Sequence, residues 1–263
     1  MGQWPKNIGF QIKLAHQFLE FGRRIPLFQI FSPNVFFSHF IPLVEPIESD
    51  YFANFESINQ LRKDKTANYL SKITFSDFKV FEKIIQSLPL NSHLQIGNSS
   101  AIRYAQLIDI HPSIEVFCNR GTSGIDGNTS TAIGAAVAND KPTILITGDI
   151  SFFYDSNGLW NNYIPKNFKI ILINNGGGGI FRILPGHDET PVFNTFFETS
   201  HCLTAEKLAK MYDFDYAIAS DEYSLESGIK NLYSNNTKPF ILEIFTPTRE
   251  NDKVLLQFFK ELI

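Results

Sequence analysis

Cysteine and histidine are scarce in this chain, and neither is spaced for metal binding or redox chemistry. The 263 residues include only two cysteines, Cys118 and Cys202, and no Cys-x-x-Cys pair. We therefore predict two free, buried thiols in a reducing, cytoplasmic setting, neither of them a nucleophile. The six histidines form no metal-ligand spacing, so His187 and His201 are interpreted as ordinary loop residues.

The chain also lacks an excess of positive charge and an uninterrupted apolar helix. Its formal net charge of −4 argues against a general nucleic-acid binder. The 20 residues Ile25–Val44 contain no Asp, Glu, Lys or Arg, but Pro26, Pro33 and Pro42 interrupt them. That stretch predicts a buried or interfacial loop–strand segment rather than a membrane span. Met1–Phe10 lacks the apolar core of a secretory signal.

Segments typical of strands and of helices alternate from about residue 75 onward. This alternation predicts an α/β fold with a doubly wound parallel sheet in residues 75–263, preceded by a short irregular region, residues 1–74. The expected strands are 93–96, 114–118, 142–147, 168–173, 214–218 and 239–246. The expected helices are 76–88, 99–108, 124–138, 155–163, 204–212, 221–233 and 251–262.

Two polar clusters that follow apolar strands give the strongest functional signal. Gly148-Asp149-Ile150-Ser151 follows 142–147, and Asn174-Asn175-Gly176-Gly177 follows 168–173. Either cluster alone is an ordinary turn signal. Because the carboxyl ends of parallel strands meet at one edge of a sheet, the two clusters together predict one site. A carboxylate, an amide oxygen and main-chain carbonyls suit a hard metal such as Mg²⁺ and, through it, a diphosphate.

A nicotinamide-binding loop is the competing interpretation of the four consecutive glycines at 176–179. That loop needs a Gly-x-Gly-x-x-Gly context and an acidic residue about 20 positions further on. Gly176–Ile180 has neither feature. The nicotinamide interpretation is therefore set aside.

The spacing Gly-Asp-x24-Asn-Asn resembles the motif of thiamine-diphosphate enzymes, whose usual form is Gly-Asp-Gly; here Ile150 takes the third place. With 97–103, 118–127 and 179–185, the chain from about Phe75 to its end resembles the MenD family. These are the 2-succinyl-5-enolpyruvyl-6-hydroxy-3-cyclohexene-1-carboxylate synthases of menaquinone biosynthesis. The resemblance implies a transferase that decarboxylates 2-oxoglutarate and adds the succinyl carbanion equivalent to isochorismate.

The resemblance also implies which residues hold the cofactor, thiamine diphosphate, and its metal. Asp149, Asn175 and the Gly177 carbonyl would bind Mg²⁺ or Mn²⁺, which bridges to the diphosphate. Ile125 would be the bulky residue beneath the cofactor that forces its bent conformation, and Ser151 would touch the diphosphate. The implied cofactor-binding residues are Ile125, Gly148, Asp149, Ile150, Ser151, Asn175, Gly177 and Ile180.

A polar pocket for two dicarboxylate substrates is implied as well. Arg103 and Arg120 are the expected carboxylate clamps, because a guanidinium binds a carboxylate bidentately and keeps its charge at any working pH. Either arginine alone would be interpreted as an ordinary surface residue. The implied pocket residues are Asn98, Ser99, Arg103, Arg120, Phe181 and Leu184.

In the MenD family a complete site forms between the pyrimidine-binding domain of one subunit and the diphosphate-binding domain of another. Nothing in this sequence resembles the pyrimidine-binding domain, and residues 1–74 resemble only pieces of a middle domain. We therefore expect a homo-oligomer or a separate partner to complete the site. The alternatives are a truncated or decayed synthase, a split subunit, another thiamine-dependent 2-oxoacid decarboxylase, or an inactive cofactor-binding module.

Overall fold

The computed structural model describes residues 32–263 except 46, 185, 187 and 235–236. The chain divides into two units, residues 1–58 and residues 59–263. The described part of the first unit holds helix α2 (Pro33–Phe40) and the short 3-10 helix η1 (Ile41–Leu43). Helix α3 (Tyr51–Leu70) begins in the first unit and ends in the second.

The apolar stretch expected to be a loop–strand segment is helical where the structure describes it. Residues 25–31 of that stretch, like Met1–Phe10, lie outside the described residues. Pro33 occupies the first turn of α2, where the missing N–H of proline loses no helical hydrogen bond. Ser32 caps the same helix by accepting the backbone N–H of Val35 at 3.3 Å. The loop–strand prediction is wrong because this proline begins a helix.

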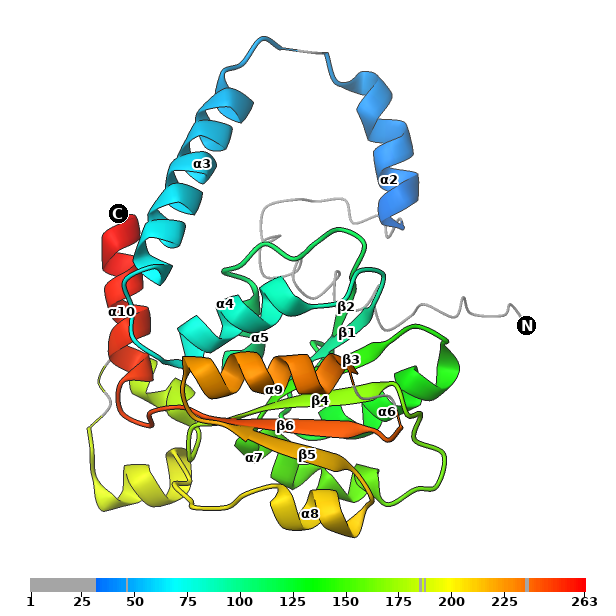
Figure 1. Ribbon diagram of the computed structural model, residues 1–263. Helices are drawn as coiled ribbons and strands as arrows, with labels where there is room; N and C mark the ends of the chain where they lie inside the picture. Colours follow the sequence, from blue (N-terminus) through cyan, green and yellow to red (C-terminus); the bar gives the residue numbers. More distant parts are fainter. Residues whose placement is uncertain (1–31, 46, 185, 187, 235–236) are drawn as a thin grey trace. The chain divides into compact units, whose positions relative to one another are not determined.

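The second unit is built on a six-stranded parallel sheet with strand order β2-β1-β3-β4-β6-β5 (Figure 1). The doubly wound parallel sheet predicted from the sequence is therefore confirmed. The chain leaves β1 toward β2 on one side and leaves β3 toward β4 on the other, which puts the topological switch point between β1 and β3. The strands are β1 His93–Ile96, β2 Glu115–Cys118, β3 Thr143–Gly148, β4 Phe168–Asn174, β5 Asp215–Ala219 and β6 Phe240–Phe245.

Helices cover both faces of the sheet and create a hydrophobic core on each (Figure 1). Helices α4, α5, α9 and α10 contribute to one core, and α6, α7 and α8 contribute to the other. Along β3, Ile144 and Ile146 face the first core while Leu145 faces the second, so the middle of this strand, which is buried on both sides, is apolar at consecutive positions. The helices are α4 Asp77–Ser87, α5 Ser100–Ala105, α6 Asn128–Ala138, α7 Asp149–Tyr154, α8 Glu206–Met211, α9 Glu222–Ser234 and α10 Asn251–Leu262.

The connection between β3 and β4 differs from the predicted helix at 155–163. Helix α7 begins at Asp149, directly after β3, and the 3-10 helix η2 (Ser156–Leu159) follows it. Asp155 lies between these helices and accepts both the backbone N–H and the hydroxyl of Ser130 at 2.7 Å. The chain therefore turns into a helix inside the Gly-Asp motif itself rather than after it.

The two cysteines are free, as predicted, but they are not buried. Cys118 is half-buried at the end of β2, and Cys202 is exposed. In the part of the chain that the structure describes, no helix has both the length and the apolar content that crossing a membrane requires.

Candidate cofactor-binding site

Asp149 lies at the centre of a hydrogen-bonded cluster where β3 and β4 end side by side. Its Oδ2 accepts the backbone N–H of Gly176 at 2.8 Å and that of Gly177 at 3.1 Å. Only 3% of Asp149 is exposed. The two polar clusters that are separated in sequence therefore meet in the structure, through the carboxylate of one and the backbone of the other.

Gly176 and Gly177 have backbone conformations that favour glycine. Their φ angles are +78° and +155°, which L side chains rarely adopt. A Cβ atom on Gly177 would lie 2.8 Å from the carbonyl oxygen of Glu198. The glycine loop therefore fits between Asp149 on one side and the returning chain at Glu198 on the other.

His201 also faces Asp149, although the sequence analysis assigned it no role. Its Nε2 lies 3.4 Å from Asp149 Oδ2, and its side chain is largely buried. Its Nδ1 accepts the backbone N–H of Leu203 at 3.1 Å, so a neutral ring carries its proton on Nε2, toward the carboxylate. His201 lies in a loop, as predicted, but it also contacts the Asp149 cluster, and no local spacing in the sequence could have revealed this contact.

Three oxygen atoms in this cluster belong to the predicted ligands of a hard cation. Asp149 Oδ1 accepts the N–H of Ile150 at 2.7 Å, and the Gly177 carbonyl accepts the N–H of Gly179 at 3.0 Å; each oxygen has a further lone pair. Asn175 donates its amide N–H to Asp77, so its amide oxygen is the end that this hydrogen bond leaves for a ligand. One carboxylate, one amide oxygen and one carbonyl fit Mg²⁺ or Mn²⁺. Among the described residues, no group of three or more His, Cys, Asp and Glu gathers for a metal.

Each asparagine of the Asn174–Asn175 pair donates its side-chain amide to a buried carboxylate. Asn174 Nδ2 lies 2.7 Å from Glu243 Oε1, and Asn175 Nδ2 lies 3.0 Å from Asp77 Oδ2. Glu243 also accepts the hydroxyl of Tyr216, whose pKa is raised by burial and by this carboxylate, so the phenol stays a donor. The sequence analysis missed both acids because they belong to other elements, Asp77 to α4 and Glu243 to β6.

Asp77 begins helix α4 and is only 2% exposed. Its carboxylate accepts hydrogen bonds from Thr246, at the end of β6, and from Asn175. Its backbone N–H donates to Asn251 Oδ1, at the start of α10, at 2.8 Å. Burial raises the pKa of Asp77 from 3.8 to about 6, although the hydrogen bonds from Thr246 and Asn175 act to lower it.

Two other residues assigned to the cofactor, Ile125 and Ser151, are in direct contact. The Ser151 hydroxyl donates to the Ile125 carbonyl and accepts the side-chain N–H of Asn128 at 3.0 Å. Asn128 also donates to the Ile125 carbonyl at 2.9 Å. These bonds hold the loop that precedes α6 against the first turn of α7. Two members of the set remain: Gly148 is the last residue of β3, and Ile180 lies in the 3-10 helix η3 (Gly179–Ile183), directly after the glycine loop.

Two of the predicted substrate-pocket residues, Asn98 and Arg120, are joined next to the switch point. Arg120 Nη1 donates to Asn98 Oδ1 at 3.0 Å. Asn98 is 2% exposed, and its amide donates to the carbonyls of Asn119 and Gly124 at 2.8 and 2.6 Å. Asn98, just after β1, therefore orients the exposed side chain of Arg120 beside the end of β1, the strand that neighbours β3.

Ser99 and Arg103 form a second pair, within α5 and its N-cap. Arg103 is exposed and donates to the Ser99 carbonyl at 3.0 Å. Ser99 has φ +72°, a conformation that costs a non-glycine residue about 1–3 kcal/mol. Phe181 packs edge-on against Phe197, with ring centroids 5.9 Å apart, and Leu184 is 54% exposed. That Phe181 and Leu184 line a pocket with the two arginines remains a prediction.

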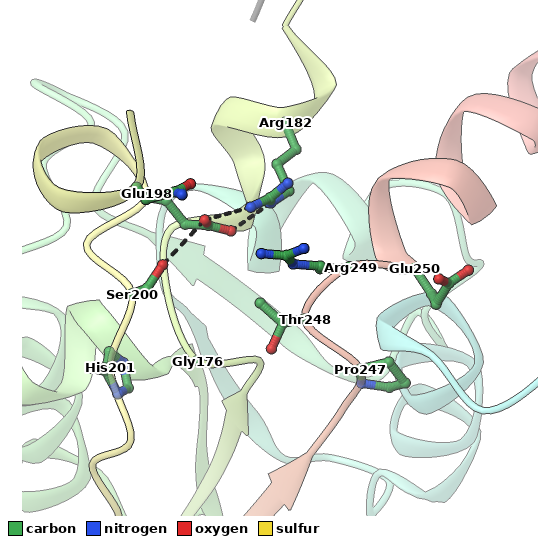
Figure 2. A pocket seen from close by; sticks show the side chains of 10 residues that line it. Gly176, Arg182, Glu198, Ser200, His201, Pro247, Thr248, Arg249 and Glu250 are labelled. Atoms are coloured by element: carbon green, nitrogen blue, oxygen red, sulfur yellow. Dashed lines mark hydrogen bonds and ion pairs between the residues drawn. The ribbon is translucent and has the colours of Figure 1, made fainter. Parts of the chain in front are cut away.

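A cleft of about 600 Å³ opens beside Gly176, and His201, Thr248 and Arg249 are among the residues that line it (Figure 2). Its wall includes a buried, bidentate ion pair: two N–H groups of Arg182 donate to the carboxylate of Glu198, at 2.5 and 2.6 Å. This pair joins η3 to the turn of π-helix η4 (Phe193–Phe197). The cleft is therefore bounded by the same segment that packs against the glycine loop.

A doubly wound parallel sheet, with a buried aspartate, an asparagine pair and a glycine loop meeting at its carboxyl edge, defines a domain that binds a cofactor diphosphate. Residues 95–244 match the family described as "Thiamine pyrophosphate enzyme, C-terminal TPP binding domain". The chain belongs to this family.

Several similar proteins are named 2-succinyl-5-enolpyruvyl-6-hydroxy-3-cyclohexene-1-carboxylate synthase. The chain is 68% identical to the protein of Flavobacterium johnsoniae over 89% of its length, and 66% identical to that of Flavobacterium psychrophilum over 88%. It is 37% identical to the protein of Bacteroides fragilis over 82% of its length. The chain spans 42% of each Flavobacterium protein and 41% of the Bacteroides protein.

A solved structure shares the fold. It is the thiamine diphosphate-dependent 4-hydroxybenzoylformate decarboxylase of Rhodococcus jostii RHA1, which superposes with a TM-score of 0.51 at 19% identity. The match covers 67% of this chain and 33% of the decarboxylase. At this identity the likeness concerns the architecture alone.

Proposed function

We propose that this chain is the diphosphate- and metal-binding part of a 2-succinyl-5-enolpyruvyl-6-hydroxy-3-cyclohexene-1-carboxylate synthase of menaquinone biosynthesis. Its substrates are 2-oxoglutarate and isochorismate. The observation that carries the proposal is the meeting of Asp149 with the Gly176–Gly177 backbone at the ends of β3 and β4. The identity of 68% to a synthase of that name supports it.

In this function the chain's own residues bind the metal and orient the cofactor and the substrates. Asp149, Asn175 and the Gly177 carbonyl would hold Mg²⁺ or Mn²⁺, and the hydrogen bond from Ser151 to the Ile125 carbonyl would fix the position of Ile125 for contact with the cofactor. Thiamine diphosphate, when bound, supplies the electron sink that stabilises a carbanion. The switch point lies outside the carboxyl ends of β1 and β3, where ligands of open α/β sheets bind.

The substrate groups that need recognition are carboxylates. Arg120, which Asn98 orients, and Arg103, which bonds to the Ser99 carbonyl, carry permanent positive charge for them. The apolar side chains of Phe181 and Leu184 complete the pocket. A pyrimidine-binding domain from a second subunit or a separate polypeptide completes the site, in a homo-oligomer or a split enzyme. The two free cysteines agree with a cytoplasmic location.

A chimera tests the proposal. The carboxy-terminal part of the Flavobacterium johnsoniae synthase would be replaced by the matching segment of this chain, and product formation from 2-oxoglutarate and isochorismate would be measured. We expect turnover within about tenfold of the parent and none detectable when Asp149→Ala is added, because loss of a group that organises the site commonly costs several kcal/mol. A folded chimera that binds thiamine diphosphate but forms no product would contradict the synthase assignment and leave a cofactor-binding module.

A further inference from the structure

We propose that Asp77, on α4, is a positioning residue that determines which end of the Asn175 amide faces the metal. This inference rests on the proposed function, because it concerns the ligand that Asn175 contributes. Asp77 is 98 positions away in sequence and contacts Asn175 through a single hydrogen bond of 3.0 Å. Its role is therefore to orient a ligand rather than to touch the metal.

A carboxamide needs such orientation because its two ends have nearly the same shape and opposite chemistry. The oxygen can bind a cation, whereas the NH₂ group can only donate hydrogen bonds. An ionised carboxylate accepts hydrogen bonds and cannot donate them. With Asp77 Oδ2 accepting its N–H, Asn175 is held with its nitrogen toward α4, and its oxygen is the end left for a cation.

The position of Asp77 itself is fixed from three sides. Thr246 donates to its other oxygen, Asn251 accepts its backbone N–H, and only 2% of Asp77 is exposed. Burying a carboxylate among apolar groups is unfavourable unless its hydrogen bonds are satisfied. If Asp77 served only to connect α4 with β6 and α10, its second carboxylate oxygen would not need to accept a hydrogen bond from the Asn175 amide.

Asp155 offers a matched comparison elsewhere in the fold. It is 6% exposed, and its two oxygens accept hydrogen bonds from the backbone and side chain of Ser130 in α6. It thus joins two elements as Asp77 does, but it contacts no predicted metal ligand through these bonds. Its loss should lower the stability of the fold without changing how strongly cofactor binding depends on the metal.

The test measures thiamine diphosphate binding to the 263-residue chain by calorimetry, with and without Mg²⁺. The readout is the Kd for thiamine diphosphate without Mg²⁺ divided by the Kd with Mg²⁺. This ratio reports how much the metal strengthens binding, and a general loss of folded protein does not change it. Loss of a group that orients a metal ligand typically weakens metal affinity about 10–100-fold. We expect Asp77→Leu to lower the ratio by about that factor. Asp77→Asn, which keeps a carbonyl acceptor for Asn175, should stay within about threefold of the unmodified chain, and so should Asp155→Leu.

Two results would overturn the inference while leaving the proposed function in place. One is an unchanged ratio in Asp77→Leu; the other is an equal fall in Asp77→Leu and Asp155→Leu, which would mean a purely structural role. If the unmodified chain shows no metal-dependent binding, the proposed function fails instead.

A measurement on the metal-free chain covers the case in which Asp77→Leu does not fold. The side-chain NH₂ signals of Asn175, assigned by their absence in Asn175→Asp, should exchange slowly with solvent in the unmodified chain and in Asp77→Asn. Rapid exchange in the unmodified chain would show that the amide is not held by Asp77 and would overturn the inference.

Discussion

The two carboxylate oxygens of Asp149 have different surroundings, and this difference organises the site. Oδ2 accepts two backbone N–H groups and faces His201 Nε2, whereas Oδ1 accepts only the N–H of Ile150 in the part of the chain that the structure describes. A buried acid with several donors on one oxygen is held in one orientation. Oδ1 is therefore the oxygen that we expect to bind the cation.

At the same scale, Arg120→Ala should separate substrate recognition from cofactor binding. Arg120 bonds to Asn98 and contacts none of the predicted metal ligands through a described hydrogen bond, so the affinity for thiamine diphosphate should not change. Its loss leaves a substrate carboxylate unpaired, which costs about 2 kcal/mol or more. In the chimera this appears as a fall in kcat/KM of at least about 30-fold. Arg62→Ala, the loss of an exposed arginine on α3 that belongs to neither the predicted pocket nor the cleft, is the control and should leave kcat/KM unchanged.

Asp77 gives the apo protein a pH-dependent stability. Because its pKa rises from 3.8 to about 6 on folding, the folded protein binds a proton that the unfolded chain releases between pH 4 and pH 6. The free energy of unfolding should therefore fall as pH rises through this window, by up to about 3 kcal/mol from Asp77. Urea unfolding at pH 4 and pH 6.5 measures this change. Asp77→Asn should show a shallower fall, and an equally steep fall in that variant would contradict the assignment.

At the scale of elements, hydrogen bonds and an ion pair join the glycine loop and Arg182 to the chain at Glu198–His201 into one assembly. Figure 2 shows the Arg182–Glu198 pair of this assembly. Gly178 donates its backbone N–H to the Glu198 carbonyl, His201 donates to the Gly176 carbonyl, and Arg182 is paired with Glu198. These bonds hold the glycine loop against the returning chain. The position of the Gly177 carbonyl therefore depends on Arg182, Glu198 and His201, which are not among the predicted cofactor-binding residues.

Gly177→Ala should damage this assembly. The φ angle of +155° is strained for alanine, and the new Cβ would lie 2.8 Å from the Glu198 carbonyl oxygen. We expect a loss of about 1–3 kcal/mol in the free energy of unfolding, with weaker binding of thiamine diphosphate and Mg²⁺. Gly134→Ala in α6 is the matched control, because nothing lies within 4 Å of its new Cβ. Equal stability of the two variants would argue against a constrained glycine loop.

The Arg182–Glu198 pair makes a second prediction for this segment. Both side chains are at most 3% exposed, so removing one partner leaves a buried charge unpaired. We expect Arg182→Met to cost about 3–5 kcal/mol, and Arg182→Met with Glu198→Gln to cost less than that single change. Thermal and urea unfolding measure both. Lys253→Met, which breaks an exposed pair with Glu250, should leave the free energy of unfolding almost unchanged, because solvent screens such a pair.

The sequence predicts elements well where local chemistry determines them. The strand at 168–173 is found at Phe168–Asn174, because a mainly apolar run rich in isoleucine, interrupted only by Lys169, suits a strand buried on both faces. The helix expected at 155–163 begins instead at Asp149, where the contact between Asp155 and Ser130 of α6 shapes the connection. Contacts between distant segments are not visible in local patterns, and that is where the prediction fails.

The candidate site shows the same division. The motif identifies Asp149 and Asn175 because their spacing places both at strand ends. Asp77, Glu243 and His201, which hold the motif residues in place, stand in segments without any recognisable spacing. Only the packing of α4, β6 and the segment after η4 brings them to the site.

At the scale of the whole molecule, the doubly wound sheet brings the Asn98–Arg120 pair and the Asp149 cluster to the two sides of one switch point. Helices on both faces bury the strands, so the polar residues collect at the carboxyl edge. The 263 residues span 42% of the Flavobacterium synthases that they match, and the remaining parts of the site are proposed to come from a pyrimidine-binding domain.

The central claim is that this fold binds the diphosphate of thiamine diphosphate through a metal held by Asp149. Calorimetric titration of the purified chain with thiamine diphosphate, with and without Mg²⁺ and alongside Asp149→Ala, tests it most directly. The account predicts saturable binding that requires Mg²⁺ and is lost in Asp149→Ala. Binding of equal affinity in Asp149→Ala, or binding that is indifferent to Mg²⁺, would contradict it.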